Sequence, residues 1–136
     1  MDRSELEAMV REILAGSPGV RLVKLPEVSV SQSDRLDTKN PADRVYTHDV
    51  LTLAESPRLG AGIMEMTKSD FAWTLHYDEI DYVISGALTV AFAGQSVTAR
   101  AGEMIFIPKG SAIRFQAPES ARFLYVTYPA DWQGAN

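Results

Sequence analysis

The chain begins with a segment whose apolar residues recur at helical spacing. Between residues 4 and 15 they lie three and four positions apart, with charged residues between them, and this period predicts an amphipathic helix. Ser4 and Glu7 have the spacing of a capping box, and glycine and proline residues directly after residue 15 end the helix. Five side chains form the predicted apolar stripe: Leu6, Met9, Val10, Ile13 and Leu14.

The helical period stops after residue 19. Residues 20–30 contain short strand-like pieces around Pro26, and residues 31–44 are mostly polar. We expect an extended arm here that crosses the following domain. We therefore divide the chain into a helix with its linker, residues 1–19, and a barrel domain that includes the arm, residues 20–136.

From Tyr46 onward the pattern changes to short apolar and β-branched runs. Turn pairs such as Ser85-Gly86 and Ala101-Gly102 interrupt these runs at fairly even spacing, which predicts an all-β antiparallel barrel or sandwich. Residues 87–92 and 96–99 flank Ala93-Gly94-Gln95 as a hairpin would. Two further runs, 104–107 and 122–128, are continuous apolar strands.

Residues 79–84 form a strand in which both faces carry apolar side chains. Alternation along a strand would turn Glu79, Asp81 and Val83 into the barrel. The other three side chains would point outward and would need the arm or a second subunit to cover them; these are Ile80, Tyr82 and Ile84. A homodimer is the simplest arrangement that does so.

Length and charge exclude several classes of protein. A chain of 136 residues accommodates one domain of this kind, and no apolar run approaches the roughly 20 residues of a membrane span. There is no cysteine, so disulfides and thiol chemistry are excluded. The net charge of -5 disfavours nucleic acid as a partner. We expect a soluble cytoplasmic protein.

Two spaced motifs resemble the signatures of the cupin barrels. Glu79 lies seven residues before Gly86, as in the first signature. The second signature runs from a glycine through a proline to another glycine, and Gly102, Pro108 and Gly110 match it. The resemblance implies a cupin, or jelly-roll, β-barrel.

The histidines of both cupin signatures are missing. Ile113 stands at the histidine position of the second signature. The two positions in the first signature fall on Trp73 and Leu75, or on Ala72 and Thr74 with the alternative spacing. Because none of these side chains is a preferred ligand of iron, zinc or copper, we expect no transition-metal site.

Longer strings resemble one cupin family in particular, the ethanolamine-utilisation cupins of the EutQ family. They are residues 73–81, residues 106–111 and residues 129–132, and the likeness extends over roughly residues 20–133. The resemblance implies a metal-free cupin from bacterial microcompartment operons. It also implies a role in assembly, an ATP-dependent acetate kinase activity, or both.

The N-terminal helix has a resemblance of its own. Residues 4–14 are similar to the targeting peptides that load enzymes into bacterial microcompartments. This implies that a shell protein binds the apolar stripe within residues 4–15, and that the protein is associated with a microcompartment. The alternative is that the stripe packs on this protein's own barrel or on its dimer mate.

The acidic residues around the first signature are the candidate chemical groups. Glu79 and Asp81 share a strand face, with Tyr77 beside them, and two inward carboxylates must share a proton, meet a cation or reach water. A hard cation such as magnesium would suit their oxygens. Alternatively, Asp78 and Asp81 bond turn amides while Glu79 holds Tyr77 or an arginine.

Other residues are candidates for ligand binding. Lys109, in the turn after Pro108, would meet a carboxylate or the phosphate of ATP at the barrel mouth, or else it is a solvated turn charge. Trp73, Asp78 and Tyr125 would line a pocket for a small acid or nucleotide, and so would three further aromatic residues, Tyr77, Tyr128 and Trp132. Aromatic residues also build barrel cores, however, so the sequence leaves both interpretations open. The alternative function is a metal-free cupin, acting as a sensor or isomerase on a sugar or small acid outside any microcompartment.

Overall fold

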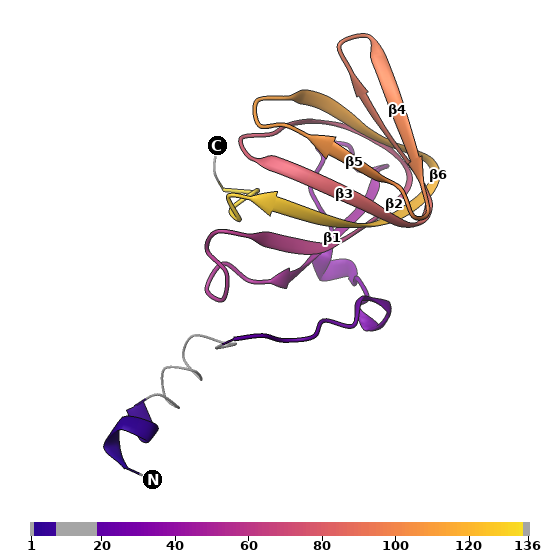
Figure 1. The fold of residues 1–136 in the computed structure, drawn as a ribbon. Helices are drawn as coiled ribbons and strands as arrows, with labels where there is room; N and C mark the ends of the chain where they lie inside the picture. The colour runs from indigo at the N-terminus through magenta and orange to yellow at the C-terminus, as the bar shows by residue number, and fades with distance from the viewer. Residues whose placement is uncertain (1, 8–18, 135–136) are drawn as a thin grey trace.

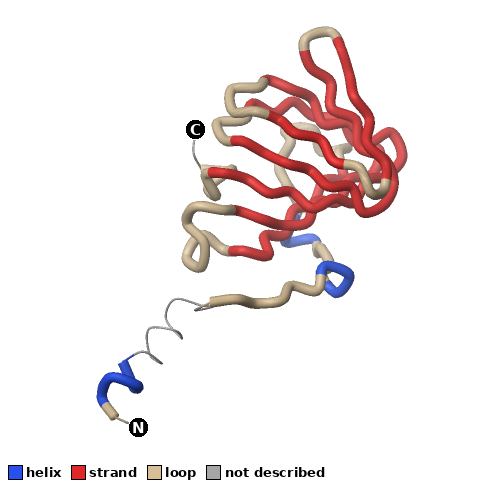
Figure 2. The backbone as a smooth tube through the Cα atoms, in the orientation of Figure 1, coloured by secondary structure: helices blue, strands red, loops and turns tan. Residues whose placement is uncertain are grey.

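The computed structural model describes residues 2–7 and 19–134, and nearly all of its regular structure is β-strand. Figures 1 and 2 show an antiparallel sheet that curls into a barrel. The strands are hydrogen-bonded in the order β1-β2-β6-β3-β4, and β5 pairs with β3. Their bounds are β1, Arg44–Leu51; β2, Gly60–Thr74; β3, Asp78–Phe92; β4, Gln95–Arg100; β5, Met104–Ile107; and β6, Ala112–Tyr128.

Three long strands let one sheet form both walls of the barrel. The register of the β2–β6 pair shifts between Thr67 and Ser69, and that of the β3–β6 pair shifts between Val83 and Ser85. Such irregularities bend a strand. The first half of β3 therefore pairs with β5, and its second half with β4.

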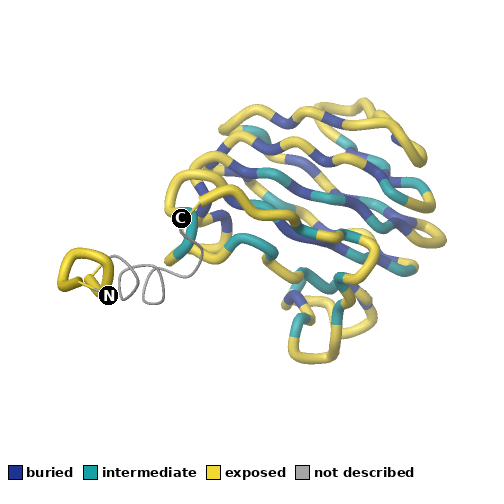
Figure 3. Tube along the Cα trace, turned by 60° about the horizontal axis from the view of Figure 1, so that its bottom comes forward, coloured by how far each residue is buried: buried dark blue, intermediate teal, exposed yellow. Residues whose placement is uncertain are grey.

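Alternation along the strands separates the core from the surface, and Figure 3 shows buried positions alternating with less buried ones along the long strands of the barrel. On β3, Val83 is fully buried, while Ile80 and Tyr82 are exposed, as the sequence predicts. The largest fully buried apolar side chains come from several strands and from the loop before β3: Tyr77, Tyr125, Phe115, Phe123, Ile63, Met66, Leu75 and Leu88.

The predicted hairpin is present. Phe92 pairs directly with Gln95, so the turn has two residues, Ala93 and Gly94. Both have positive φ, 48° and 75°, which is the geometry that matches the twist of a tight hairpin. β4 consequently begins at Gln95, one residue before the predicted boundary.

The arm differs from its prediction, because residues 20–30 contain no strand. They hold a 3-10 turn, Leu25–Glu27, and a second turn follows at Gln32–Asp34. The carbonyl groups of Leu25 and Val28 accept hydrogen bonds from Arg122 Nη2 at 3.0 and 2.7 Å. Arg122 points outward from β6, so the arm crosses the outer face of the sheet and is fixed there by a side chain rather than by strand pairing.

The N-terminal helix begins earlier than the capping box predicts. Residues 3–7 are helical, and the Asp2 carboxylate accepts the Glu5 amide at 2.8 Å, so Asp2 caps the helix and Ser4 lies inside it. Leu6 is exposed. The other members of the predicted stripe, Met9, Val10, Ile13 and Leu14, lie outside the described residues. Among the described residues, no helix is long and apolar enough to cross a membrane.

Candidate functional site

Two acidic side chains of β3 point into the barrel. Glu79 lies opposite Thr127 of β6 and Ile107 of β5, and Asp81 lies opposite Tyr125 and Ile105. Glu79 is 4% exposed and Asp81 is not exposed at all. The alternation predicted from the sequence therefore places both carboxyl groups in the core of the barrel.

The oxygens of this pair lack the partners that buried charges require. Glu79 Oε2, both carboxyl oxygens of Asp81 and Thr127 Oγ1 are buried and receive no hydrogen bond from an N–H group or a hydroxyl group. The two carboxyl groups are within hydrogen-bonding reach of each other, which requires that one of them keeps a proton. None of the ion pairs among the described residues includes Glu79 or Asp81. A buried ionised carboxylate without such partners is costly, so the favourable state of the pair retains protons.

Burial is the main reason why both carboxyl groups hold their protons. It raises the pKa of Glu79 to about 7. Burial also raises the pKa of Asp81 well above its usual value, and the neighbouring charge of Glu79 adds to this effect. Tyr77, whose pKa is raised by burial and by Glu79, stays a neutral phenol. At neutral pH the pair is therefore at least partly protonated.

The space beside Glu79 is very small. It leaves about 10 Å³ for the centre of a water molecule, which is close to the lower limit for holding one. Its polar wall is formed by Tyr77 and Glu79, and the rest is aromatic or aliphatic. Trp73 Nε1 donates a hydrogen bond to Tyr77 Oη at 2.6 Å, so this phenol is fixed in place.

The C-terminal segment closes the same space. Trp132 is 6% exposed, and its ring lies 5.8 Å from that of Trp73 and 5.4 Å from that of Tyr125, measured between centroids. Trp132 Nε1 and Tyr125 Oη both donate hydrogen bonds to Asp49 Oδ1, at 3.1 and 2.5 Å. Sequence reasoning missed Asp49, because a single aspartate on an edge strand carries no spacing signal.

The structure brings together most of the predicted site residues. Trp73, Tyr77, Glu79 and Tyr125 line the small space, and Asp81 follows Glu79 on the same face. Asp78 and Lys109 do not join them. Asp78 is exposed at the start of β3, and its Oδ1 accepts the Lys109 amide at 2.8 Å, as the alternative reading of Asp78 expected.

Lys109 nevertheless lies at the end of the barrel that Trp132 closes. Asp78, which binds its amide, pairs with Tyr128, the residue from which the C-terminal segment starts. The Lys109 side chain is exposed. A ligand that entered beside Trp132 would therefore pass on the same side of the barrel as this ammonium group.

The positions of the cupin histidines also face inward. Trp73 lies directly opposite Ile113 across β2 and β6, and Leu75 is fully buried. Among these positions only Glu79 has kept a side chain that commonly binds metal ions. The expectation that no transition metal binds stays a prediction that elemental analysis can test.

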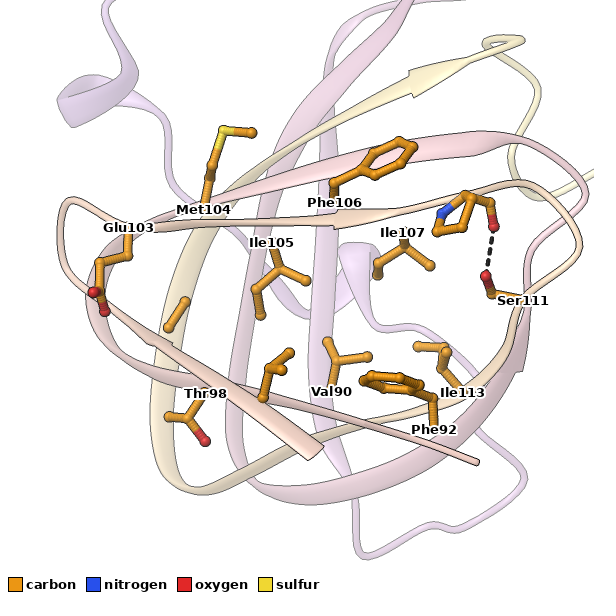
Figure 4. A pocket seen from close by; sticks show the side chains of 13 residues that line it. Val90, Phe92, Thr98, Glu103, Met104, Ile105, Phe106, Ile107, Ser111 and Ile113 are labelled. Atoms are coloured by element: carbon orange, nitrogen blue, oxygen red, sulfur yellow. Dashed lines mark hydrogen bonds between the residues drawn. The ribbon is translucent and has the colours of Figure 1, made fainter. Parts of the chain in front are cut away.

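A second, larger cavity opens between β4 and β5. Figure 4 shows Ile105 and Ile107 of β5 pointing toward Val90, Phe92 and Ile113 across it. Its volume is about 500 Å³. Its one titratable wall residue, Glu103, already accepts the Arg100 amide at 2.8 Å, so the chemical groups of the barrel lie on the Glu79 side.

Comparisons with known proteins identify relatives over the full length of the barrel. The family model described as ethanolamine utilisation protein EutQ matches residues 3–134. A protein from Clostridioides difficile named acetate kinase EutQ is 52% identical, over the whole of this chain and 97% of the relative. A protein of the same name from Salmonella typhimurium is 41% identical over 88% of this chain and 51% of the relative. The chain thus spans about half the length of this second protein.

Solved structures confirm the fold. The structure of the Clostridium difficile EutQ protein has a TM-score of 0.83 and 63% identity, over 85% of this chain and 84% of that chain. The cupin domain of Cnp3 from Schizosaccharomyces pombe has a TM-score of 0.60 at 16% identity, over 78% of this chain and 72% of that chain. This second likeness concerns the fold alone, and the predicted cupin barrel is confirmed.

Proposed function

Since the chain belongs to the EutQ family of ethanolamine utilisation proteins, we propose that it binds a small carboxylic acid at the Glu79–Asp81 pair and phosphorylates it, as an acetate kinase does. The observation that carries the proposal is a set of four buried oxygens, on Glu79, Asp81 and Thr127, that receive no hydrogen bond from an N–H group or a hydroxyl group. The names of the relatives support the choice of acetate as substrate.

A protonated carboxyl pair suits a small carboxylate. A neutral carboxyl group donates one hydrogen bond, and a carboxylate ligand is an acceptor. Because burial raises the pKa of Glu79 to about 7, the pair can still donate near neutral pH. Acetate binding should therefore weaken as the pH rises above about 7, where the pair loses its proton and repels the anion.

Phosphoryl transfer would then use an oxygen of the bound acid as the nucleophile. That oxygen bonds to the terminal phosphorus of ATP, the bond from this phosphorus to its bridging oxygen breaks, and ADP leaves with acetyl phosphate formed. Such reactions depend on positioning and on stabilisation of charge. Lys109, exposed at the end of the barrel that Trp132 closes, is the candidate cation for the phosphate groups.

Magnesium does not fit inside the barrel as it stands. The ion prefers six oxygen ligands and keeps several of its waters, whereas the space beside Glu79 has room for about one water. Among the described residues, no group of three or more histidine, cysteine, aspartate or glutamate side chains is placed to hold a metal ion. Magnesium at Glu79 and Asp81 stays a prediction from the sequence that this geometry does not favour.

Acetate-dependent release of ADP from ATP tests the proposal directly. Glu79→Gln keeps the shape of the side chain but removes its acidic proton, and should lower turnover at least tenfold. Asp78→Asn is the matched control, since Asp78 is the exposed neighbour on the opposite face, and should keep turnover within about twofold. Full activity in Glu79→Gln would rule out this site, and a wild-type protein without turnover would favour the assembly role.

The assembly role is supported by an uncovered apolar surface. We define the outer β3–β5 face as Ile80, Tyr82, Met104, Phe106 and Tyr128, which are 37 to 59% exposed. Ile80 lies opposite Phe106, and Tyr82 lies opposite Met104, so the surface is continuous. We infer that a second copy of the chain covers it, and that the N-terminal helix directs the dimer to a microcompartment shell.

A further inference from the structure

Trp132 differs from the other walls of the Glu79 space in how it is held. Met64 and Phe71 belong to β2, and Phe115 and Tyr125 belong to β6, so sheet hydrogen bonds fix them. Leu36 of the arm is held by its amide, which donates to Val45 O at 2.8 Å. Trp132 lies beyond the end of the last strand, in a turn where its amide bonds to Ala130 O at 2.8 Å.

The Trp132 ring forms part of the wall of this space. It packs against Trp73 on one side and Tyr125 on another, at centroid distances of 5.8 and 5.4 Å. With the ring in place, the space beside Glu79 holds about one water. Acetate has four heavy atoms, so even this small acid enters only if the ring moves.

One exposed carboxylate keeps the ring closed. Asp49, on the edge strand β1, accepts the Trp132 indole N–H and the Tyr125 hydroxyl through the same oxygen, Oδ1. When the ring swings out, its N–H can donate to water, and Asp49 keeps its bond to Tyr125. No buried polar group is therefore left unpaired by the movement.

We infer that Trp132 is the movable wall of the Glu79–Asp81 site and sets the upper size of the acid that the site accepts. This inference rests on the proposed function for the identity of the ligand, but not for the position of the wall. A two-carbon acid displaces the ring least, so the ring keeps most of its contacts with Trp73 and Tyr125. A longer or aromatic acid would hold the ring open and lose the contacts with Trp73 and Tyr125.

Removing the ring tests the wall without any reference to catalysis. Folded Trp132→Ala protein should bind free indole, measured by saturation-transfer NMR and calorimetry, at least tenfold more tightly than the wild type does. Leu59→Ala is the control, because it removes an exposed apolar side chain of the β1–β2 loop that lines neither cavity and lies outside the outer β3–β5 face. Indole binding that is no tighter in Trp132→Ala than in the wild type would overturn the inference.

A second experiment leaves Trp132 itself in place. The chain has two tryptophans, so in the Trp73→Phe background the fluorescence reports Trp132 alone. Asp49→Ala removes the acceptor, and should raise acrylamide quenching of Trp132 at least twofold. Unchanged quenching would show that Asp49 does not hold a movable ring, and would also overturn the inference.

The size limit has its own measurement. Wild-type protein should bind acetate more tightly than benzoate, and Trp132→Ala should reduce this preference at least tenfold. An unchanged preference would contradict Trp132 as the size-determining wall. If indole binds Trp132→Ala as expected but the wild type shows no acetate-dependent turnover, the inference about Trp132 is supported and only the proposed kinase activity is contradicted.

Discussion

Glu79 and Asp81 show what the alternation of side chains along a strand predicts about single residues and what it leaves open. Alternation predicted that both face inward, and both are buried. The sequence did not decide whether the two carboxyl groups meet a cation, share a proton or reach water. The structure favours retained protons, because the buried oxygens have no cationic partner among the described side chains and about one water of space.

Retained protons make the stability of the barrel depend on pH. In unfolded chains Glu and Asp titrate near 4, whereas burial raises the pKa of Glu79 to about 7 and that of Asp81 well above its usual value. Between those values the native state binds more protons than the unfolded state. The free energy of unfolding should therefore be highest at mildly acid pH and fall as the pH rises toward 7 and beyond.

The double variant Glu79→Gln with Asp81→Asn should remove this dependence. A shift of one pKa unit corresponds to about 1.4 kcal/mol. Because the pKa of Glu79 is raised from 4.5 to about 7, the free energy of unfolding of the variant should exceed that of the wild type at pH 8 by on the order of 3 kcal/mol. Urea unfolding from pH 5 to pH 8 measures it. Asp78→Asn should leave the slope unchanged, and a wild-type stability that rises over this range would contradict the assignment.

Residues beyond the acidic pair were harder to predict because their roles depend on segments far apart in the chain. Tyr125 was a candidate as an aromatic near the barrel mouth, yet its hydroxyl partner, Asp49, lies 76 positions away. Trp132 was one of several aromatic residues named as pocket candidates, but nothing in the sequence showed that its indole N–H would bond to Asp49. The need for glycine at position 62 was equally hidden in the sequence, because it depends on the distant Tyr125: a Cβ atom at this position would lie 2.1 Å from Tyr125 Oη.

At the scale of elements, strands were predictable and the arm was not. Alternation marked the first part of β3, and continuous apolar runs marked β5 and the second part of β6. The arm contains apolar residues in the same short runs, but its backbone binds the Arg122 guanidinium in place of a strand edge. No local pattern distinguishes these two outcomes, since the partner is 97 positions away from Leu25.

The N-terminal helix carries the prediction about location. Residues 1–20, fused to a fluorescent protein, should direct it into co-expressed microcompartment shells. Leu6→Glu should disperse the signal, because it places a charge on the apolar stripe at a position that is exposed in this structure. Fluorescence microscopy measures the fraction of fusion protein in foci.

The matched control for the helix is Glu5→Gln, which changes the polar face and should leave the foci intact. A fusion that stays diffuse with the native sequence would contradict the targeting role. The same holds if Leu6→Glu, made in the complete chain, lowers the unfolding midpoint of the barrel. The helix would then belong to the fold rather than to a partner.

At the scale of the whole molecule, the described chain covers one part of the outer surface of the sheet and leaves another part exposed. Over β1, β2 and β6 the arm lies on the sheet, fixed by Arg122 and by the contact of His48 with Asp34 at 3.1 Å. The outer β3–β5 face has no covering within the described chain. Of the two partners that the sequence allowed for Ile80 and Tyr82, the arm is thus excluded over its described residues.

A second subunit is therefore the remaining candidate to cover the outer β3–β5 face, and this predicts the mass of the protein in solution. Wild-type protein should sediment at twice the mass of one chain at micromolar concentration. Tyr82→Glu should shift it toward the monomer, because a charge in the centre of an apolar interface is left unpaired. Leu59→Glu places the same charge on an exposed leucine of the β1–β2 loop and should leave the dimer intact. A strictly monomeric wild type would contradict the interface.

The place of β6 in the sheet has a consequence for biosynthesis. β6 lies between β2 and β3, yet it is the last strand of the chain to leave the ribosome (Figure 1). Until residues 112–128 emerge, the two long strands beside it have no neighbour on those edges, and unpaired edges invite pairing with other chains. Folding of the barrel must therefore wait until residues 112–128 have left the ribosome, and a nascent chain stalled before Ala112 would depend on chaperones to stay unaggregated.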